Sequence, residues 1–243
     1  IYNIIYMSVS LLVNEIINRP DNKGKFVYQV PISEFTDRFP ILNEVWTHYK
    51  GMCNYGTESK EQTNTLNAVI DKIPYLYDMR NDVMSYPDKT KYDKYENSET
   101  YGKPDSKLVV IPYNEVWSLK NGKYQHLIQN RSFPKYHWDN TKLRELENIG
   151  VDPRGNFYYP AGGFREWHSN RLDIPGYRVY FVACEKDNMS GLNYIDPITN
   201  TVKTLYDKNE TANIFYVNNS KENAFFHSVF SDTDRFSFGF NVN

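Results

Sequence analysis

The chain has 243 residues, and its 28 Lys and Arg nearly balance its 30 Asp and Glu, which gives a formal net charge of −2. This balance excludes a broad, non-specific polyanion binder and argues against an extensive nucleic-acid footprint, because such proteins carry excess positive charge. The two cysteines have no zinc-type spacing, and the simplest interpretation is a reduced, intracellular protein. The 40% of hydrophobic residues is enough to form a hydrophobic core.

Residues 1–105 are predicted to form a helical and loop-rich annex packed on the rest of the chain. The apolar segment 1–13 is too short to span a bilayer, so we interpret it as an amphipathic element and expect a cytoplasmic protein without a membrane partner. Apolar residues recur at helical spacing in 32–39 and again in 63–73. Residues 85–106 have the composition of a loop, which we expect to shape the entrance of a site.

Residues 106–243 have a different pattern, which predicts short strands. An apolar run at 107–112 is followed by a hairpin-type turn at Asn121-Gly122, and a short helix over 139–148 ends at Gly150. Further strand candidates are separated by turn residues; they are 164–168, 177–184, 192–195, 202–206, 213–217, 225–230 and 236–242. So many short strands predict a mainly β fold, either a sandwich, a jelly roll or a barrel.

The last of these strands carries a strict alternation of side chains. Because successive residues of a strand point to opposite faces, Arg235 and Ser237 are expected on one face and Phe236, Phe238 and Phe240 on the other. The strand is therefore predicted to present a polar, cationic face and an aromatic one.

Two histidines of this half, His168 and His227, are candidate metal ligands. Glu166 and Asn170 are expected on the same strand face as His168, since each is two residues away from it. Imidazole is a common metal ligand, and strand alternation can point both rings inward.

These residues resemble the pattern of the 2-oxoglutarate/Fe(II)-dependent oxygenases. His168-Ser169-Asn170 stands where that family has H-x-D/E, His227 where it has its distal histidine, and Arg235-Phe236-Ser237 where it has R-x-S. Trp167 to Asn170 is also similar to the W-H-[ST]-N signature of a bacteriophage subgroup. The resemblance covers roughly residues 107–243, and it implies a double-stranded β-helix, a jelly-roll or cupin-like core.

The resemblance implies a hydroxylase that uses Fe(II), 2-oxoglutarate and O2. His168 and His227 would hold the iron, and Arg235 with Ser237 would bind the far carboxylate of 2-oxoglutarate, because guanidinium binds carboxylates through two hydrogen bonds. Arg178 is a second candidate anion binder, and Tyr159 is a candidate for the wall of the co-substrate pocket. Oxidative decarboxylation would release succinate and CO2 while a substrate C–H bond is oxidised.

Asn170 departs from the family pattern, which has Asp or Glu at this position. Its amide oxygen could ligate the metal, Glu166 could supply the carboxylate, or water could complete a two-histidine site of the aspartyl/asparaginyl hydroxylase type. Chloride, as in the related halogenases, is the least favoured alternative because Asn would crowd the halide. A decayed site without metal is the remaining alternative.

A second hypothesis is a non-catalytic jelly-roll protein with a structural or binding role, for example in a virus, where it would reside in the host cytoplasm. The near-neutral charge and aromatic strands suit this hypothesis too. Under the enzyme hypothesis the substrate is open: a protein side chain, a nucleobase and a small metabolite all remain candidates.

Overall fold

The computed structural model describes residues 8–52, 140–159, 164–168, 170, 174–218 and 224–242. The predicted helix at 63–73, the predicted loop at 85–106 and the strands predicted between 107 and 128 lie outside these residues. So does the position 105/106 at which the annex is predicted to meet the core.

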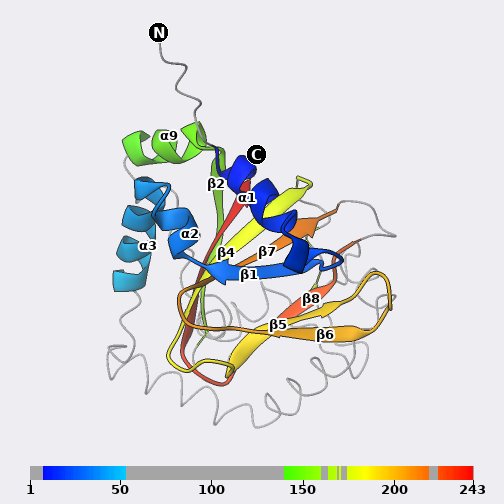
Figure 1. The fold of residues 1–243 in the computed structure, drawn as a ribbon. Coiled ribbons are helices and arrows are strands. Elements are labelled where there is room, and N and C mark those ends of the chain that lie inside the picture. The colour runs from blue at the N-terminus through cyan, green and yellow to red at the C-terminus, as the bar shows by residue number, and fades with distance from the viewer. Residues whose placement is uncertain are drawn as a thin grey trace, which may run out of the picture.

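Among the described residues, the strands form two antiparallel sheets, which confirms the mainly β prediction (Figure 1). The five-stranded sheet has the order β1-β7-β4-β9-β2, with β1 at Val27–Pro31, β7 at Thr211–Val217, β4 at Gly176–Cys184, β9 at Arg235–Val242 and β2 at Val151–Tyr159. The four-stranded sheet has the order β3-β8-β5-β6, with β3 at Phe164–His168, β8 at His227–Ser231, β5 at Ser190–Ile195 and β6 at Val202–Tyr206.

The strands from β2 to β9 pair in a nested order. β2 pairs with β9, β3 with β8, β4 with β7 and β5 with β6. Such an order arises when a long antiparallel hairpin folds over itself, and it gives a sandwich of two sheets in the manner of a jelly roll. One consequence is that residues distant in sequence, such as those of β2 and β9, become direct neighbours.

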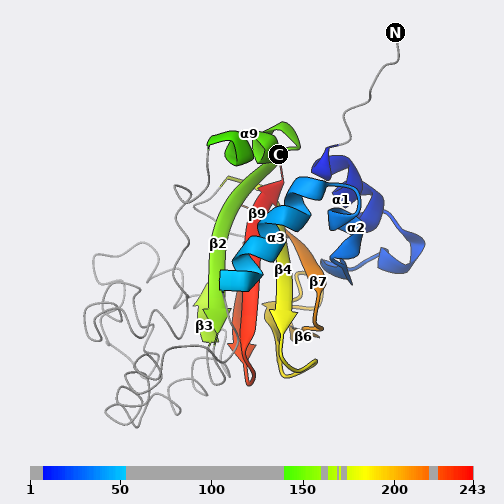
Figure 2. The same cartoon turned by 90° about the vertical axis from the view of Figure 1, so that its left-hand side faces the viewer.

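Helices cover the outer face of the five-stranded sheet (Figure 2). α1 buries four residues at the spacing of one helix face, because it is apolar only on the side that meets the core. The helices are α1 (Val9–Ile17), α2 (Ser33–Thr36), α3 (Pro40–Met52) and α9 (Asn140–Asn148), with a 3-10 turn at Pro20–Asn22. α9 ends before Gly150, whose φ of 79° is one that glycine tolerates at a helix terminus.

The predicted alternation of β9 is confirmed. Phe236, Phe238 and Phe240 are fully buried in the core between sheet and helices. Arg235 and Ser237 lie on the opposite face, toward the four-stranded sheet, where they line a cavity. β9 thus contributes to two different environments with alternate residues.

Two strands were not predicted. β1 belongs to the N-terminal region, for which only helices and loops were expected, yet it pairs with β7 along its whole length. β2 contains Pro153 and Gly155, which are typical of turns. The structure accommodates them with a register shift between Pro153 and Asn156, so the strand continues to Tyr159 opposite Arg235.

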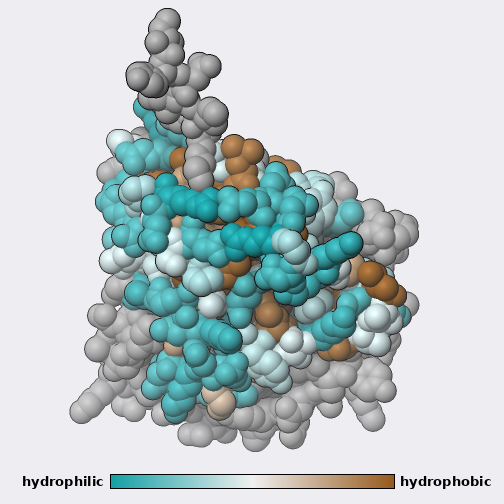
Figure 3. Space-filling model, viewed as in Figure 1, coloured by the Kyte–Doolittle hydropathy of each residue, from teal (hydrophilic) through white to brown (hydrophobic). Residues whose placement is uncertain are grey.

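The face that carries α1, α2 and β1 is mostly hydrophilic, with small separate hydrophobic patches (Figure 3). In the described part of the chain, no helix combines the length and the apolar character needed to cross a membrane.

Candidate functional site

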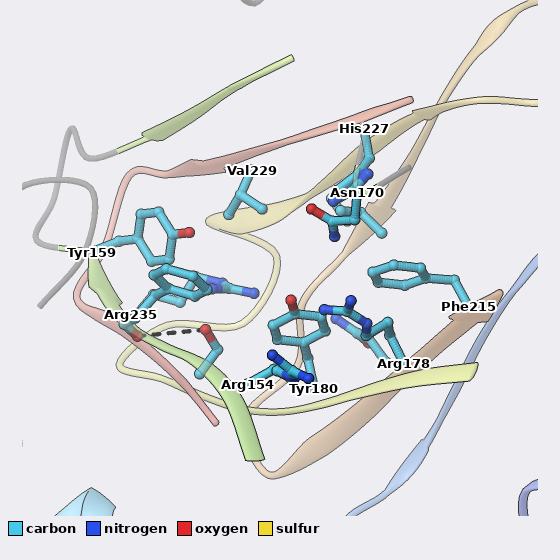
Figure 4. Close-up of a pocket in the computed structure, with 13 residues that line it drawn as sticks. Arg154, Tyr159, Asn170, Arg178, Tyr180, Phe215, His227, Val229 and Arg235 are labelled. Carbon is cyan, nitrogen blue, oxygen red and sulfur yellow. Dashed lines mark hydrogen bonds between the residues drawn. The ribbon is translucent and has the colours of Figure 1, made fainter. Parts of the chain in front are cut away.

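A cavity of about 210 Å³ lies between the two sheets, and residues singled out in the sequence meet there. Its wall includes Tyr159, Asn170, Arg178, His227, Arg235 and Ser237. Figure 4 shows Arg235 and Tyr159 on one side of the cavity and His227 with Asn170 on the other. The volume is below the roughly 300–1,000 Å³ of pockets for drug-sized ligands, so the cavity suits a small metabolite.

His227, at the start of β8, is 3% exposed and held in one orientation. Its Nδ1 lies 3.0 Å from the carbonyl oxygen of Phe225. Its ring stacks on Phe225 at 5.3 Å between centroids and contacts Phe215 at 5.2 Å. Because a carbonyl only accepts, Nδ1 carries a proton, so in the neutral ring Nε2 is the nitrogen with the lone pair, as a metal-binding imidazole needs.

The register of β3 and β8 places His168 directly opposite His227. The pairing follows a register shift between Arg165 and His168. Asn170 lines the cavity beside His227 (Figure 4). Glu166 belongs to β3, and its side chain, like that of His168, lies outside the described part.

Arg235, at the start of β9, is 3% exposed and forms a buried ion pair. Its Nε donates a hydrogen bond to Oδ2 of Asp207 at 2.7 Å, and its guanidinium lies 5.0 Å from the centre of the Tyr159 ring. Burial acts to lower the pKa of Arg235, but the Asp207 carboxylate raises it above its usual value. The guanidinium is therefore a permanent cation inside the protein.

Ser237 and Tyr159 surround this guanidinium. Ser237 follows Arg235 on the same face of β9 and is 1% exposed. Its hydroxyl donates to the carbonyl oxygen of Phe157 at 3.5 Å, a long hydrogen bond (Figure 4). Tyr159 is also 1% exposed and pairs with Arg235 in the β2–β9 ladder. A hydroxyl, a phenol and a guanidinium thus converge on this end of the cavity.

Two further arginines contribute to the wall. Arg178 extends from β4 and is 4% exposed, and Arg154 extends from β2, where its Nε donates to Asp152 at 2.8 Å. No Asp or Glu belongs to the cavity wall among the described residues. The lining therefore carries guanidinium groups, two of which pair with carboxylates that are not part of the wall, and their remaining N–H donors suit an anionic ligand.

Gly239 on β9 allows Tyr180 and β2 to approach the strand closely. A Cβ at this position would lie 2.4 Å from a ring carbon of Tyr180 and 2.6 Å from the backbone oxygen of Arg154. Any side chain here would displace two elements of the cavity wall.

Within the residues that the structure describes, no group of three or more His, Cys, Asp and Glu side chains is placed to hold a metal ion. The described portion of the predicted ligand set is His227 and Asn170. Cys184 is not an alternative nucleophile, because burial and then the nearby Asp207 carboxylate raise the pKa of its thiol to about 11.

Three functional candidates were missed from the sequence. Asp207 is buried and contacts Arg235, whereas Asn213 and Arg154 line the cavity. Asp207 stands in Tyr206-Asp207-Lys208, where a charged residue after a strand is typical of a turn. No local signal distinguishes it; only the nested pairing of the strands brings it to Arg235.

No protein-family model matches the chain, and no curated protein sequence matches it. Among solved structures, an oxidoreductase of the 2OG-Fe(II) oxygenase family from Burkholderia pseudomallei is similar over 46% of this chain and 60% of its own, with 11% identity and a TM-score of 0.31. AviO1 from Streptomyces viridochromogenes is similar over 44% and 63%, with 11% identity and a TM-score of 0.29.

A prolyl-4-hydroxylase from Pseudomonas putida is similar over 43% of this chain and 60% of its own, with 14% identity and a TM-score of 0.28. The chain thus spans about three fifths of the length of each of these proteins.

Proposed function

We propose that the chain is an Fe(II)- and 2-oxoglutarate-dependent oxygenase, a hydroxylase with a double-stranded β-helix core. One observation carries the proposal: a single cavity has an oriented histidine on one side and a buried arginine on the other. The first suits a metal ion and the second suits the far carboxylate of a dicarboxylate. The nested pairing of β2 to β9 supports the fold part of the proposal.

His227 and His168 are the proposed iron ligands. The hydrogen bond of His227 Nδ1 to the Phe225 carbonyl directs coordination to Nε2. The antiparallel register supports the partnership with His168. Asn170 or Glu166 would be the third protein ligand. Alternatively, water or chloride would occupy that coordination position.

Arg235 and Ser237 are the proposed anchor for 2-oxoglutarate. A buried, permanently charged guanidinium holds a carboxylate with strong hydrogen bonds, and the Ser237 hydroxyl can donate a further one. Tyr159 forms the wall behind the guanidinium, and Arg178 is the second candidate anion binder. When bound, iron and 2-oxoglutarate would supply the activation of O2 for C–H oxidation, with succinate and CO2 as products.

The chain's own contribution is binding and orientation. Leu192, Phe215 and Val229 belong to the inter-sheet hydrophobic cluster and give the cavity an apolar part of its wall. Polar groups in such surroundings interact more strongly with a charged ligand than they would in water.

The direct test is succinate formation from 2-oxoglutarate by the purified protein, with and without Fe(II), under air. Fe(II)-dependent succinate is expected even without a primary substrate, at a slow rate. A protein that binds neither Fe(II) nor 2-oxoglutarate would contradict the proposal and favour a non-catalytic jelly-roll protein. The same assay can then screen peptides, nucleosides and small metabolites for one that accelerates the reaction.

A further inference from the structure

Asp207 contacts Arg235 but is not part of the cavity wall, and it is fully buried. Its Oδ2 accepts hydrogen bonds from Nε of Arg235 at 2.7 Å and from the hydroxyl of Ser190 at 2.9 Å. Its Oδ1 accepts from Nδ2 of Asn213 at 2.8 Å. These partners extend from β9, β5 and β7, so one carboxylate joins the two sheets.

All three partners of Asp207 are donors. An ionised carboxylate is acceptor-only and can satisfy them together, whereas an amide of the same shape would direct an NH2 group against one of them. Gln29 reinforces the arrangement, because its Nε2 donates to Oδ1 of Asn213 at 3.0 Å and thereby leaves Nδ2 of Asn213 to face Asp207. The surroundings therefore select a charged carboxylate.

The contact with Asp207 also determines which atoms of Arg235 remain for a ligand. Nε is used by Asp207, and Tyr159 lies 5.0 Å from the guanidinium carbon. No described residue accepts a hydrogen bond from either Nη atom, although Arg235 lines the cavity. The two Nη atoms are the donors that a carboxylate ligand would meet.

We propose that Asp207 is a positioning residue for 2-oxoglutarate, which holds Arg235 by Nε so that both Nη atoms bind the far carboxylate. The inference rests on the proposed function and adds to it a residue that does not itself touch the ligand. It also implies selectivity, since a keto acid that lacks the far carboxylate gains nothing from an oriented guanidinium.

The experiment compares Asp207→Asn with the wild-type protein, both loaded with Fe(II) under anaerobic conditions. Calorimetry measures Kd for 2-oxoglutarate and for 2-oxopentanoate, which has the same keto-acid end and no second carboxylate. We expect Asp207→Asn to weaken 2-oxoglutarate binding about 10- to 100-fold, the range for hydrogen bonds to charged groups. Binding of 2-oxopentanoate and of Fe(II) should change less than about 2-fold. Asp196→Asn, an Asp-to-Asn change at a buried Asp that pairs with Lys203 outside the cavity, is the matched control.

A double variant separates positioning from a structural role. In an Arg235→Gln background, Asp207→Asn should weaken 2-oxoglutarate binding no further, because the group that it orients is gone. Ser190→Ala provides a milder second variant should Asp207→Asn fail to fold. It removes one neutral hydrogen bond to the carboxylate and should weaken 2-oxoglutarate binding about 2- to 10-fold, again without affecting 2-oxopentanoate.

Several results would overturn the inference. An equal loss of both keto acids would show a structural role, and tighter binding of 2-oxoglutarate by Asp207→Asn would show that the carboxylate only repels the ligand. Unchanged binding in a wild-type protein that does bind 2-oxoglutarate would reject the inference and leave the proposed function intact. A wild-type protein that binds no 2-oxoglutarate would reject both.

Discussion

The two faces of the five-stranded sheet show how one set of strands serves stability and chemistry separately. On the outer face, β9 contributes Phe236, Phe238 and Phe240 to a core shared with the helices. On the inner face, the same strand contributes Arg235 and Ser237 to a cavity with charged walls. Adjacent residues thus have opposite surroundings, apolar on one side and polar on the other.

Substitutions at adjacent positions of β9 should therefore impair different properties, either stability or ligand binding. Outer-face changes should reduce the free energy of unfolding and leave ligand affinity unaltered. Inner-face changes should reduce ligand affinity at a smaller cost in stability, except where a buried charge loses its partner.

The largest effect is expected on the inner side of the sandwich, for His227→Ala. Fe(II) affinity should fall by roughly 100-fold or more, since even groups that only orient a metal-binding histidine contribute 10- to 100-fold, and succinate formation should cease. Anaerobic Fe(II) titration measures the change. His48→Ala, on the exposed side of α3, is the control and should bind Fe(II) normally. Unchanged metal affinity in His227→Ala would exclude His227 as a ligand.

Phe238→Ala tests the outer face. Phe238 is fully buried and packs against Phe181 and Phe240, with ring centroids 6.2 and 5.5 Å away. Its truncation should lower the free energy of unfolding by about 3–5 kcal/mol, the usual cost of replacing a buried Phe by Ala. Urea denaturation measures this loss. The Kd for 2-oxoglutarate should stay within about 2-fold below the unfolding transition, and a selective loss of binding would break the distinction between the faces.

Ser237→Ala is the inner-face counterpart, one residue away from Phe238. Loss of a neutral hydroxyl donor should weaken 2-oxoglutarate binding about 2- to 10-fold. Stability should change by less than about 1 kcal/mol, because the hydrogen bond of Ser237 to Phe157 is long, at 3.5 Å. Calorimetry and urea denaturation on the same preparation provide both values. A large loss of stability with unchanged affinity would place Ser237 in the core rather than in the site.

The smallest effect is expected outside both faces, at Asp196 in the turn after β5. The hydrogen bond from Lys203, followed by one from the backbone N–H of Thr199, lowers the pKa of Asp196 to about 2 from its usual 3.8. A carboxyl whose pKa falls on folding stabilises the protein above its unfolded pKa. That contribution disappears as the pH falls from about 4 to 2.

Asp196→Asn should therefore show a flatter dependence of stability on pH than the wild type over this interval. Thermal unfolding at pH 4, 3 and 2 measures the difference. The two proteins should bind 2-oxoglutarate equally at pH 7. Parallel pH profiles would show that the Lys203 contact contributes nothing to folding.

The strands after residue 164 could be predicted to within a few residues, because alternation and turn residues agree there. Two strands escaped prediction for opposite reasons: β1 is short and ends in Pro31, and β2 contains residues typical of turns. Their positions depend on the partners β7 and β9, which lie far away in the sequence. Sequence patterns indicate faces and turns, whereas long-range pairing decides which strands exist.

The candidate site shows the same division. His227, Arg235 and Ser237 were predicted to act together, and they line one cavity, while their roles as ligands stay predictions. The predicted roles of Glu166 and His168 as ligands also stay predictions, because their side chains lie outside the described part. Asp207 escaped prediction because its importance arises from a contact across 28 residues of chain with Arg235. A carboxylate behind an arginine leaves no pattern in the sequence.

The alternation of β9 has a consequence for insertions and deletions. Removing one residue at its start would shift every later residue to the opposite face, so that Phe side chains would enter the cavity and polar ones the core. Removing two residues would restore the faces and displace the chain only along the ladder. We therefore expect β9 to tolerate insertions or deletions of two residues far better than those of one residue. Deletion scanning with a folding reporter can test this difference between even and odd changes in length.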